Sequence, residues 1–206
     1  MRNPIDALTH GLPREWRIAI DWAVTILGAV VIVLAIKAYV VNPYRIPSSS
    51  MEPTLHCARP LSGCMARFSD RVLANRFIYH FRDPHRGEIV VFKTPPRAQV
   101  ACTHAPGGNG GDTFVKRLIA LPGDRWREQD GYIYINGAKL DEPYIEPARR
   151  DQQTIPEKTV PKDQYVMLGD NRSSSCDSRS WGTVPRKNLI GPVFATYWPP
   201  KRIGFR

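Results

Sequence analysis

The segment Thr113-Phe114-Val115-Lys116-Arg117-Leu118-Ile119-Ala120-Leu121-Pro122-Gly123-Asp124 has the pattern of a β-strand that ends in a turn. Most of its first nine residues are aromatic or aliphatic, and Pro-Gly-Asp then stops the strand. Five further segments beyond Pro43 share this pattern and are bounded by Gly, Pro or Asp: residues 71–76, 88–93, 132–135, 164–168 and 189–198. We therefore predict that residues 42–206 form a mainly β domain.

Three connecting segments complete this prediction. Asn136-Gly137 directly follows the strand pattern 132–135 and predicts a type I′ hairpin turn, because this pair readily adopts positive φ angles. Residues 94–112 contain Pro95-Pro96 and a run of glycines at 107–111, which predicts a flexible loop insertion. Residues 142–162 carry scattered charges and four prolines, and we expect them to cover the surface without regular structure.

Trp22–Val41 is an apolar run of 20 residues, interrupted only by one threonine and one lysine. As a helix it would be ~30 Å long, which matches the hydrocarbon core of a bilayer. Asn42-Pro43 would end the helix, because proline lacks an N–H and restricts the residue before it. A buried helix of a soluble core and a cleaved signal peptide are the alternatives. The length, the all-round apolarity and the lack of an Ala-x-Ala site favour an uncleaved signal anchor.

The charge distribution bears on orientation and partners. Arg14 and Arg17 precede the span and Arg45 follows it, which slightly favours a cytoplasmic N-terminus. We therefore expect a cytoplasmic segment 1–21, a transmembrane anchor 22–41 and an extracytoplasmic domain 42–206 at the cell membrane. The net charge is +10; the first 41 residues carry +1, which leaves +9 for the domain. Such a basic domain would be attracted to anionic lipid. Nucleic acid is not favoured as a partner, since no helix-turn-helix, RNP or zinc-finger pattern is present.

The four cysteines fit an exported domain. They allow two disulfides in three connectivities, and Cys57 and Cys64 close the shortest loop, so we favour that pair. Free thiols remain an open alternative for at least two of the four. A zinc site is another alternative, with a set of candidate ligands whose spacing matches no known zinc knuckle: His56, Cys57, Cys64, Cys102 and His104.

Ser50 and Lys116 are the candidate nucleophile and base. Ser50 lies in a turn that is stiffened by Pro47 and Pro53 and that directly follows the apolar span. A serine needs a base to attack a carbonyl, and a desolvated lysine can serve as that base. An ordinary lysine has a pKa of ~10.4, so that about one in 2,500 is neutral at pH 7. Lys116 alternates with apolar neighbours and could point inward, although an outward, solvated lysine is more usual in a strand.

Gly169–Gly182 is the third segment of interest. Its density of Gly, Asp, Asn and Ser predicts a loop with Asx turns. Asp177 and Arg179 could form an ion pair that holds the loop rigid, and Trp181 could cover it. A hydroxyl in this loop could hydrogen-bond the lysine amine and orient it.

Four blocks of the chain, in this order, resemble bacterial type I signal peptidases, the Ser-Lys leader peptidases of family S26. They are residues 46–55, 86–93, 114–124 and 169–185. Each block alone is weakly specific, whereas the four together are highly specific. The resemblance covers most of residues 42–198 and implies a mostly antiparallel β architecture.

The resemblance also implies a reaction. The enzyme would remove signal peptides from exported preproteins, cutting after small residues at the −1 and −3 positions, without a metal or cofactor. Ser50 would attack the scissile carbonyl, and Lys116 would act as general base and later protonate the leaving amine. The Ser48 hydroxyl and the Ser50 N–H would form the oxyanion hole. Ser175 would orient Lys116.

Further residues take supporting roles by the same resemblance. Asp177 and Arg179 would shape the site without taking part in the chemistry. The substrate would bind as an extended strand, added to a sheet edge. Five side chains would line the shallow substrate pockets: Ile46, Pro47, Met51, Val91 and Val115.

The chain departs from well-known members in three places. It has one predicted span where some members have two, Ser49 stands where glycine is common, and the segment 94–112 is rich in glycine. The related self-cleaving repressors carry a DNA-binding domain where this chain has its span, which argues against that family. A peptidase specialised for pilin or conjugation precursors remains an alternative. A non-catalytic scaffold is less favoured because both Ser50 and Lys116 are present. A histidine-based site would use one of four residues whose spacing does not favour it: His56, His80, His85 or His104.

Overall fold

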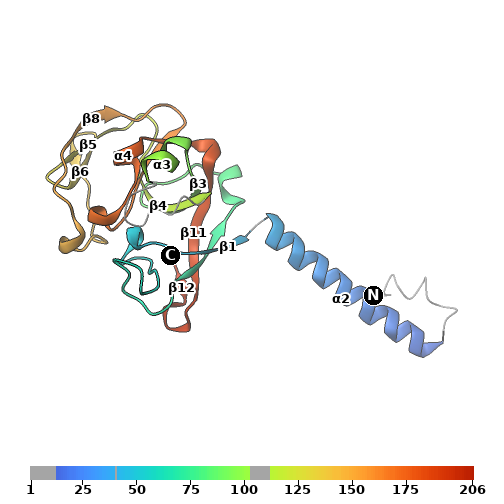
Figure 1. Ribbon diagram of the computed structural model, residues 1–206. Helices are drawn as coiled ribbons and strands as arrows, with labels where there is room; N and C mark the ends of the chain where they lie inside the picture. The colour runs from blue at the N-terminus through green and yellow to red at the C-terminus, as the bar shows by residue number, and fades with distance from the viewer. Residues whose placement is uncertain (1–12, 40, 103–111) are drawn as a thin grey trace. The chain divides into compact units, whose positions relative to one another are not determined.

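The computed structural model describes residues 13–39, 41–102 and 112–206, with side chains throughout these ranges except at 36–39. Most of the predicted cytoplasmic segment 1–21, the glycine run 107–111 and His104 lie outside the described residues. The chain divides into two compact units, residues 1–41 and 42–206 (Figure 1).

The first unit is a single long helix, α2 (Arg14–Tyr39). Within it, Arg14–Ala35 is long and apolar enough to cross a membrane, with a mean hydropathy of 2.5, and it is the one such helix in the part of the chain that the structure describes. The helix begins eight residues before the predicted span at Trp22. The extra residues include Arg14, Glu15 and Arg17, whose polarity hides them from a search for an apolar run.

The second unit is mainly β, as predicted. Among the described residues its larger sheet has eight strands in the order β1-β2-β11-β3-β4-β9-β10, with β12 paired to β11. The pairings between β2, β11, β3, β4, β9 and β10 are antiparallel. The strands are β1 (Val41–Arg45), β2 (Arg71–Asn75), β3 (Ile89–Lys93), β4 (Thr113–Ala120), β9 (Gln164–Leu168), β10 (Val184–Pro185), β11 (Leu189–Trp198) and β12 (Gly204–Phe205).

A smaller sheet with the order β7-β6-β5-β8 is also antiparallel. Figure 1 shows β5, β6 and β8 gathered at one end of this unit. Its strands are β5 (Arg125–Gln129), β6 (Tyr132–Ile135), β7 (Ala138–Lys139) and β8 (Ile155–Thr159). The predicted hairpin at Asn136-Gly137 is confirmed, since β6 pairs with β7 around it and both residues have positive φ.

Two segments are more regular than predicted. Residues 142–162, expected to lack regular structure, contain β8 and a 3₁₀ turn, η3 (Pro147–Arg149). β8 is an exposed edge strand, so it lacks the apolar alternation that predicts a strand. The expected loop 94–112 contains the helix α3 (Pro96–Ala101), which starts with a proline at its first position, where the missing N–H costs nothing.

The four cysteines form two disulfides. Cys57 pairs with Cys64, as favoured from the sequence, and Cys102 pairs with Cys176. The alternative of free thiols is therefore wrong. The second disulfide joins the end of α3 to the loop that follows β9. Figure 1 shows α3 next to α4 (Ser178–Trp181), the short helix that follows this loop.

Three apolar clusters form the core of the second unit. One lies among β3, β4, β9, α3 and α4, and contains Trp181, which is a core residue and not a surface cover. A second surrounds the residues that follow β1, and a third joins β4 and β9 to the smaller sheet. Strand β4 contributes to all three clusters, so its position is fixed on every side.

Candidate active site

Ser50 lies in a single turn of 3₁₀ helix, η1 (Ser49–Met51), which three residues separate from the end of β1. The loop after β9 fixes the backbone of this turn, because Asn171 N donates to Ser50 O at 3.1 Å and Asn171 Nδ2 donates to Ser49 O at 3.0 Å. The Ser50 hydroxyl lies 3.2 Å from the Ser48 hydroxyl. The structure therefore brings the two predicted serines together on an anchored turn.

Lys116 lies on β4, opposite Val90 of β3, and is 4% exposed. The inward orientation that we considered from the sequence is therefore correct. Burial lowers the pKa of Lys116 from 10.5 to about 8; Arg179 also lowers this pKa, whereas Asp177 and Asp170 raise it. About one in eleven copies of this amine is then neutral at pH 7, compared with about one in 2,500 for an ordinary lysine.

Gly169 joins the Lys116 strand to the Ser50 turn. The antiparallel register of β4 and β9, continued by one position, places Gly169 opposite Lys116. A Cβ atom built on Gly169 would lie 2.2 Å from Ser175 Oγ and 2.5 Å from the Ser50 carbonyl oxygen. Such a close approach is open only to glycine. The lysine strand, the serine turn and Ser175 therefore meet at this residue.

Asp177 and Arg179 form the predicted ion pair. Arg179 Nε donates to Asp177 Oδ1 at 2.8 Å, and Nη2 donates to Oδ2 at 2.9 Å. Asp177 Oδ2 also accepts a bond from the Gly169 N–H at 3.1 Å. Burial raises the pKa of Asp177, but Arg179, Lys116 and the Gly169 N–H together outweigh burial, and the pKa lies below its ordinary value. Asp177 is therefore a buried carboxylate that acts electrostatically on Lys116.

The Ser175 hydroxyl also lies beside Gly169, but it is unpaired among the described residues. It is buried, and it has no hydrogen-bond partner among the residues that the structure describes. The predicted orienting hydrogen bond to Lys116 is thus not formed in this conformation, although Ser175 is in place beside Gly169.

Four of the five predicted pocket residues gather near the serine turn. Ile46, Met51 and Val91 are buried in one apolar cluster, and the half-buried Val115 packs against it. Pro47, in contrast, is exposed. This cluster gives the turn an apolar neighbourhood.

Comparison with known proteins identifies the family. Residues 19–198 match the family model described as "Signal peptidase, peptidase S26". The chain belongs to this family. It is 42% identical over 180 residues to a probable signal peptidase I-2 of Synechocystis, a match that covers 87% of this chain and 73% of that protein. It is 39% identical to a signal peptidase I of Leptolyngbya laminosa, with 87% and 80% covered. A solved signal peptidase I from Enterococcus faecalis is 30% identical, has a TM-score of 0.42, and matches over 54% of this chain and 97% of that chain.

As a member of this family the chain is a serine endopeptidase, and three residues that hold its candidate site together were not predicted. Arg117, next to Lys116, donates two hydrogen bonds to Asp170, Nε to Oδ1 at 2.8 Å and Nη2 to Oδ2 at 2.6 Å. Thr54, four residues after Ser50, donates to Asp170 Oδ2 at 2.6 Å. Asp170 therefore ties the neighbours of both predicted catalytic residues together. Its position in a Gly-Asp-Asn loop was the available signal, but it suggests only a local turn.

The peptidase also supports its serine turn from the other side. Glu52 is buried, accepts a bond from the Cys57 N–H at 3.1 Å, and pairs with His56, one of the histidines weighed for zinc or base chemistry. A Cβ atom on Gly63 would lie 2.8 Å from Ser49 Oγ. The loop closed by the first disulfide thus packs directly against the turn that carries Ser50.

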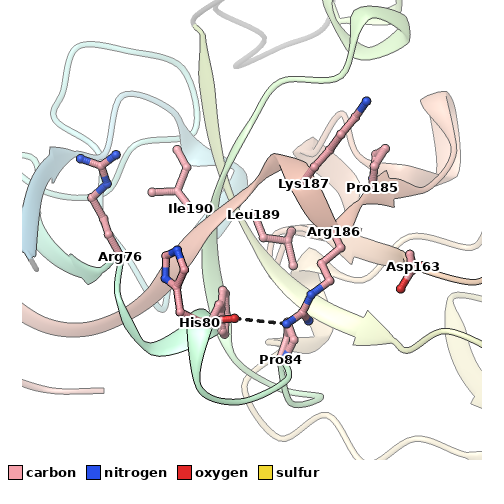
Figure 2. Close-up of a pocket in the computed structure, with 10 residues that line it drawn as sticks. Arg76, His80, Pro84, Asp163, Pro185, Arg186, Lys187, Leu189 and Ile190 are labelled. Atoms are coloured by element: carbon pink, nitrogen blue, oxygen red, sulfur yellow. Dashed lines mark hydrogen bonds between the residues drawn. The ribbon is translucent and has the colours of Figure 1, made fainter. Parts of the chain in front are cut away.

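A separate pocket of about 630 Å³ lies elsewhere on the peptidase. Figure 2 shows Arg76, His80, Arg186 and Lys187 around it. Arg186 donates to the Tyr79 carbonyl at 3.2 Å, which is the dashed line in Figure 2. None of the predicted site residues lines this pocket, so it does not belong to the candidate active site.

Proposed function

We propose that this peptidase is a membrane-anchored Ser-Lys endopeptidase that removes signal peptides from exported preproteins. The observation that carries the proposal is the buried Lys116, whose pKa of about 8 lies within reach of neutral pH, on a strand that Gly169 joins to the Ser50 turn. A neutral lysine amine can take the proton of a serine hydroxyl and later return it to the leaving amine.

The remaining roles follow from this chemistry. Ser50 Oγ attacks the scissile carbonyl, and the Ser48 hydroxyl and the Ser50 N–H stabilise the oxyanion, each donor contributing roughly 3–4 kcal/mol. Ser175 orients the lysine amine once substrate has excluded water. Asp177, held by Arg179, limits how far burial lowers the pKa of Lys116.

Substrate selection rests on the apolar cluster beside the turn. We propose that Ile46, Met51, Val91 and Val115 face the small side chains of the substrate, and that the exposed Pro47 forms the rim. We propose that the substrate binds extended and is cut after small residues at the −1 and −3 positions. An extended strand satisfies its backbone hydrogen bonds along a sheet edge, and its alternate side chains then face the pockets.

We also propose that α2 anchors the enzyme in the cell membrane with its N-terminus in the cytoplasm. Residues 1–21 would then be cytoplasmic, residues 22–41 would span the membrane, and residues 42–206 would be extracytoplasmic. Both disulfides belong to residues 42–206, and disulfides persist in oxidising compartments outside the cytoplasm. The balance of Arg14 and Arg17 before the predicted span 22–41 against Arg45 after it agrees with this orientation.

An exposed aromatic and basic surface supports lipid as a second partner. Phe68 and Trp198 contact edge to face at 6.4 Å and line a pocket of about 530 Å³. Arg67, Lys201 and Arg202 line the same pocket. Tryptophan beside basic residues is typical of surfaces that meet anionic headgroups. We propose that this surface rests on the membrane from which the substrate is presented.

Cleavage of a purified preprotein with an Ala-x-Ala site tests the main proposal. The wild type, in detergent or lipid, should cut after the second alanine, and Ser50→Ala and Lys116→Ala should be folded but inactive. Lys93→Ala is the matched control, because Lys93 is exposed at the end of the neighbouring strand. Full activity in Ser50→Ala or Lys116→Ala would exclude the dyad. A folded but inactive wild type would direct the assay to pilin-like precursors.

A further inference from the structure

Arg179 is shared by three carboxylates from three parts of the chain. Besides its two bonds to Asp177, its Nη1 binds Asp151 and lies 3.5 Å from Glu128 Oε1, and its Nη2 donates to the Arg172 carbonyl at 2.8 Å. Asp177 belongs to the loop after β9 (residues 169–177), here called the active-site loop, whereas Glu128 lies on β5 and Asp151 precedes β8. The guanidinium therefore connects the active-site loop to the smaller sheet.

Glu128 is the unusual member of this group. It is 1% exposed, and neither of its oxygens accepts a hydrogen bond from any residue that the structure describes. A buried carboxyl without hydrogen bonds is costly, and the ion pair with Arg179 offsets part of this cost. If this side chain only filled space, an apolar residue here would make the folded protein more stable. The carboxyl is thus poorly explained by packing alone.

The position of Asp151 is also fixed. A Cβ atom on Gly131 would lie 1.9 Å from the Asp151 carbonyl oxygen, so the backbone of Asp151 packs directly on the turn after β5. Glu128 and Asp151 are therefore held on one rigid frame, the smaller sheet. Arg179 is held from this frame on one side and binds Asp177 on the other.

Asp177 links Arg179 to the candidate active site. Asp177 accepts the Gly169 N–H at 3.1 Å, and Gly169 lies between Ser175 and the Ser50 turn. Asp177 raises the pKa of Lys116, whereas Arg179 lowers it. A displacement of Arg179 would therefore change both the position of the loop and the electrostatics of the lysine.

We propose that Glu128 is a positioning residue of this enzyme: from the smaller sheet it holds Arg179 against Asp177, and its charge state is transmitted through Arg179 to Lys116. This inference rests on the proposed Ser-Lys function. It assigns a catalytic dependence to a side chain that touches neither the substrate nor the reacting atoms.

The charges around Glu128 support this coupling. Burial raises the pKa of Glu128 from 4.5 to about 7; Arg179 and Arg172 lower this pKa, and Asp151 and Asp177 raise it. Glu128 thus gains its charge just below the pH at which Lys116 loses its own. A charged Glu128 neutralises Arg179 more fully, which weakens the lowering effect of Arg179 on the pKa of Lys116. Ionisation of Glu128 therefore opposes deprotonation of Lys116.

Two substitutions separate position from charge. Glu128→Gln keeps the shape but never ionises, whereas Glu128→Ala removes the contact with Arg179. Glu157→Gln is the control, since Glu157 lies on β8 of the same sheet and pairs with the exposed Arg125 at 3.5 Å. The full-length enzyme in detergent should be assayed for kcat and KM from pH 6 to 10, with folding followed by circular dichroism.

We expect Glu128→Ala to lower the plateau kcat by about tenfold or more, with KM changed less than about twofold, because misplacement of the loop affects the chemical step. Glu128→Gln should retain a plateau kcat within about threefold of wild type. In both variants the rising limb of the pH profile should move to lower pH by about half a unit, while Glu157→Gln leaves it unchanged.

Several outcomes would overturn the proposal. They are a wild-type kcat and pH profile in Glu128→Ala, or a loss confined to the melting temperature, or an unshifted pH profile in a folded Glu128→Gln. An active wild type with an active Lys116→Ala would instead refute the dyad itself. The two failures are therefore distinguishable in one set of assays.

Discussion

The buried Lys116 predicts that activity depends on pH. With a pKa of about 8, the neutral fraction of this amine is about 9% at pH 7, about 50% at pH 8 and about 91% at pH 9. If neutral Lys116 is the general base, kcat/KM for a preprotein should rise about tenfold between pH 7 and pH 9 and level off above. A substrate without titratable groups near its cleavage site keeps the profile attributable to the enzyme.

The same burial predicts that Lys116 destabilises the folded protein at neutral pH. The pKa of Lys116 falls from 10.5 to about 8 on folding, so the unfolded chain binds more protons between these two values and stability rises with pH there. Below pH 8 the cost of holding the protonated amine is of the order of 3 kcal/mol. Lys116→Met should therefore be inactive yet more stable than wild type by up to about 3 kcal/mol at pH 6–7, and this advantage should disappear by about pH 10.5.

Chemical denaturation of the full-length protein in detergent at pH 6.5, 8 and 10, together with the pH profile of cleavage, tests both statements. Lys93→Met is the control: this lysine is exposed at the end of β3, so its replacement should give no pH-dependent gain. A rate that is flat from pH 7 to pH 9, or a Lys116→Met variant that is no more stable at pH 6.5, would refute the reasoning.

Three further predictions follow from other contacts. The double variant Cys102→Ser/Cys176→Ser should lose about 4 kcal/mol of stability on the chain-entropy estimate for a separation of 74 residues, and should cleave more slowly, as denaturation and cleavage assays would show; reductant, which also opens the Cys57–Cys64 disulfide, should destabilise wild type at least as much. Gly169→Ala should abolish cleavage, because its Cβ would lie 2.5 Å from a backbone oxygen of the serine turn; a wild-type rate would contradict this packing. Trp198→Ser should slow cleavage in anionic lipid vesicles but not in detergent, and equal effects in both media would argue against a lipid contact.

The fold was predictable where the strand pattern is local. Strands β6, β9 and β11 have the predicted bounds, and β2, β3 and β4 differ by one residue at an end. Strand β5 was missed because Arg125-Trp126-Arg127-Glu128-Gln129 is mostly charged or polar. Its alternation is still present, since Trp126 and Glu128 are both buried, but one of the two inward positions is a carboxyl. In a strand of only five residues, one inward carboxyl is enough to hide the hydrophobic alternation.

The candidate site divides in the same way. Ser50 and Lys116 stand in short motifs that can be read directly, and the ion pair between Asp177 and Arg179 spans two residues. The contacts between Arg117 and Asp170, and between Glu128 and Arg179, join positions about fifty residues apart. With 29 basic and 19 acidic residues in the chain, the sequence offers many equivalent pairings. Only the register of the sheets selects among them.

The charges around Lys116 shift its pKa in opposite directions. Burial has the largest effect on the pKa of Lys116 and lowers it. A lysine that acts as a base benefits from this only if it can still hold the proton and return it to the leaving amine. Asp177 opposes the effect of burial, and Arg179 opposes the effect of Asp177, so the net pKa depends on how fully Arg179 is neutralised. The carboxyls of the smaller sheet set that degree of neutralisation. On this argument the smaller sheet adjusts the base of the reaction, as well as covering one side of the core.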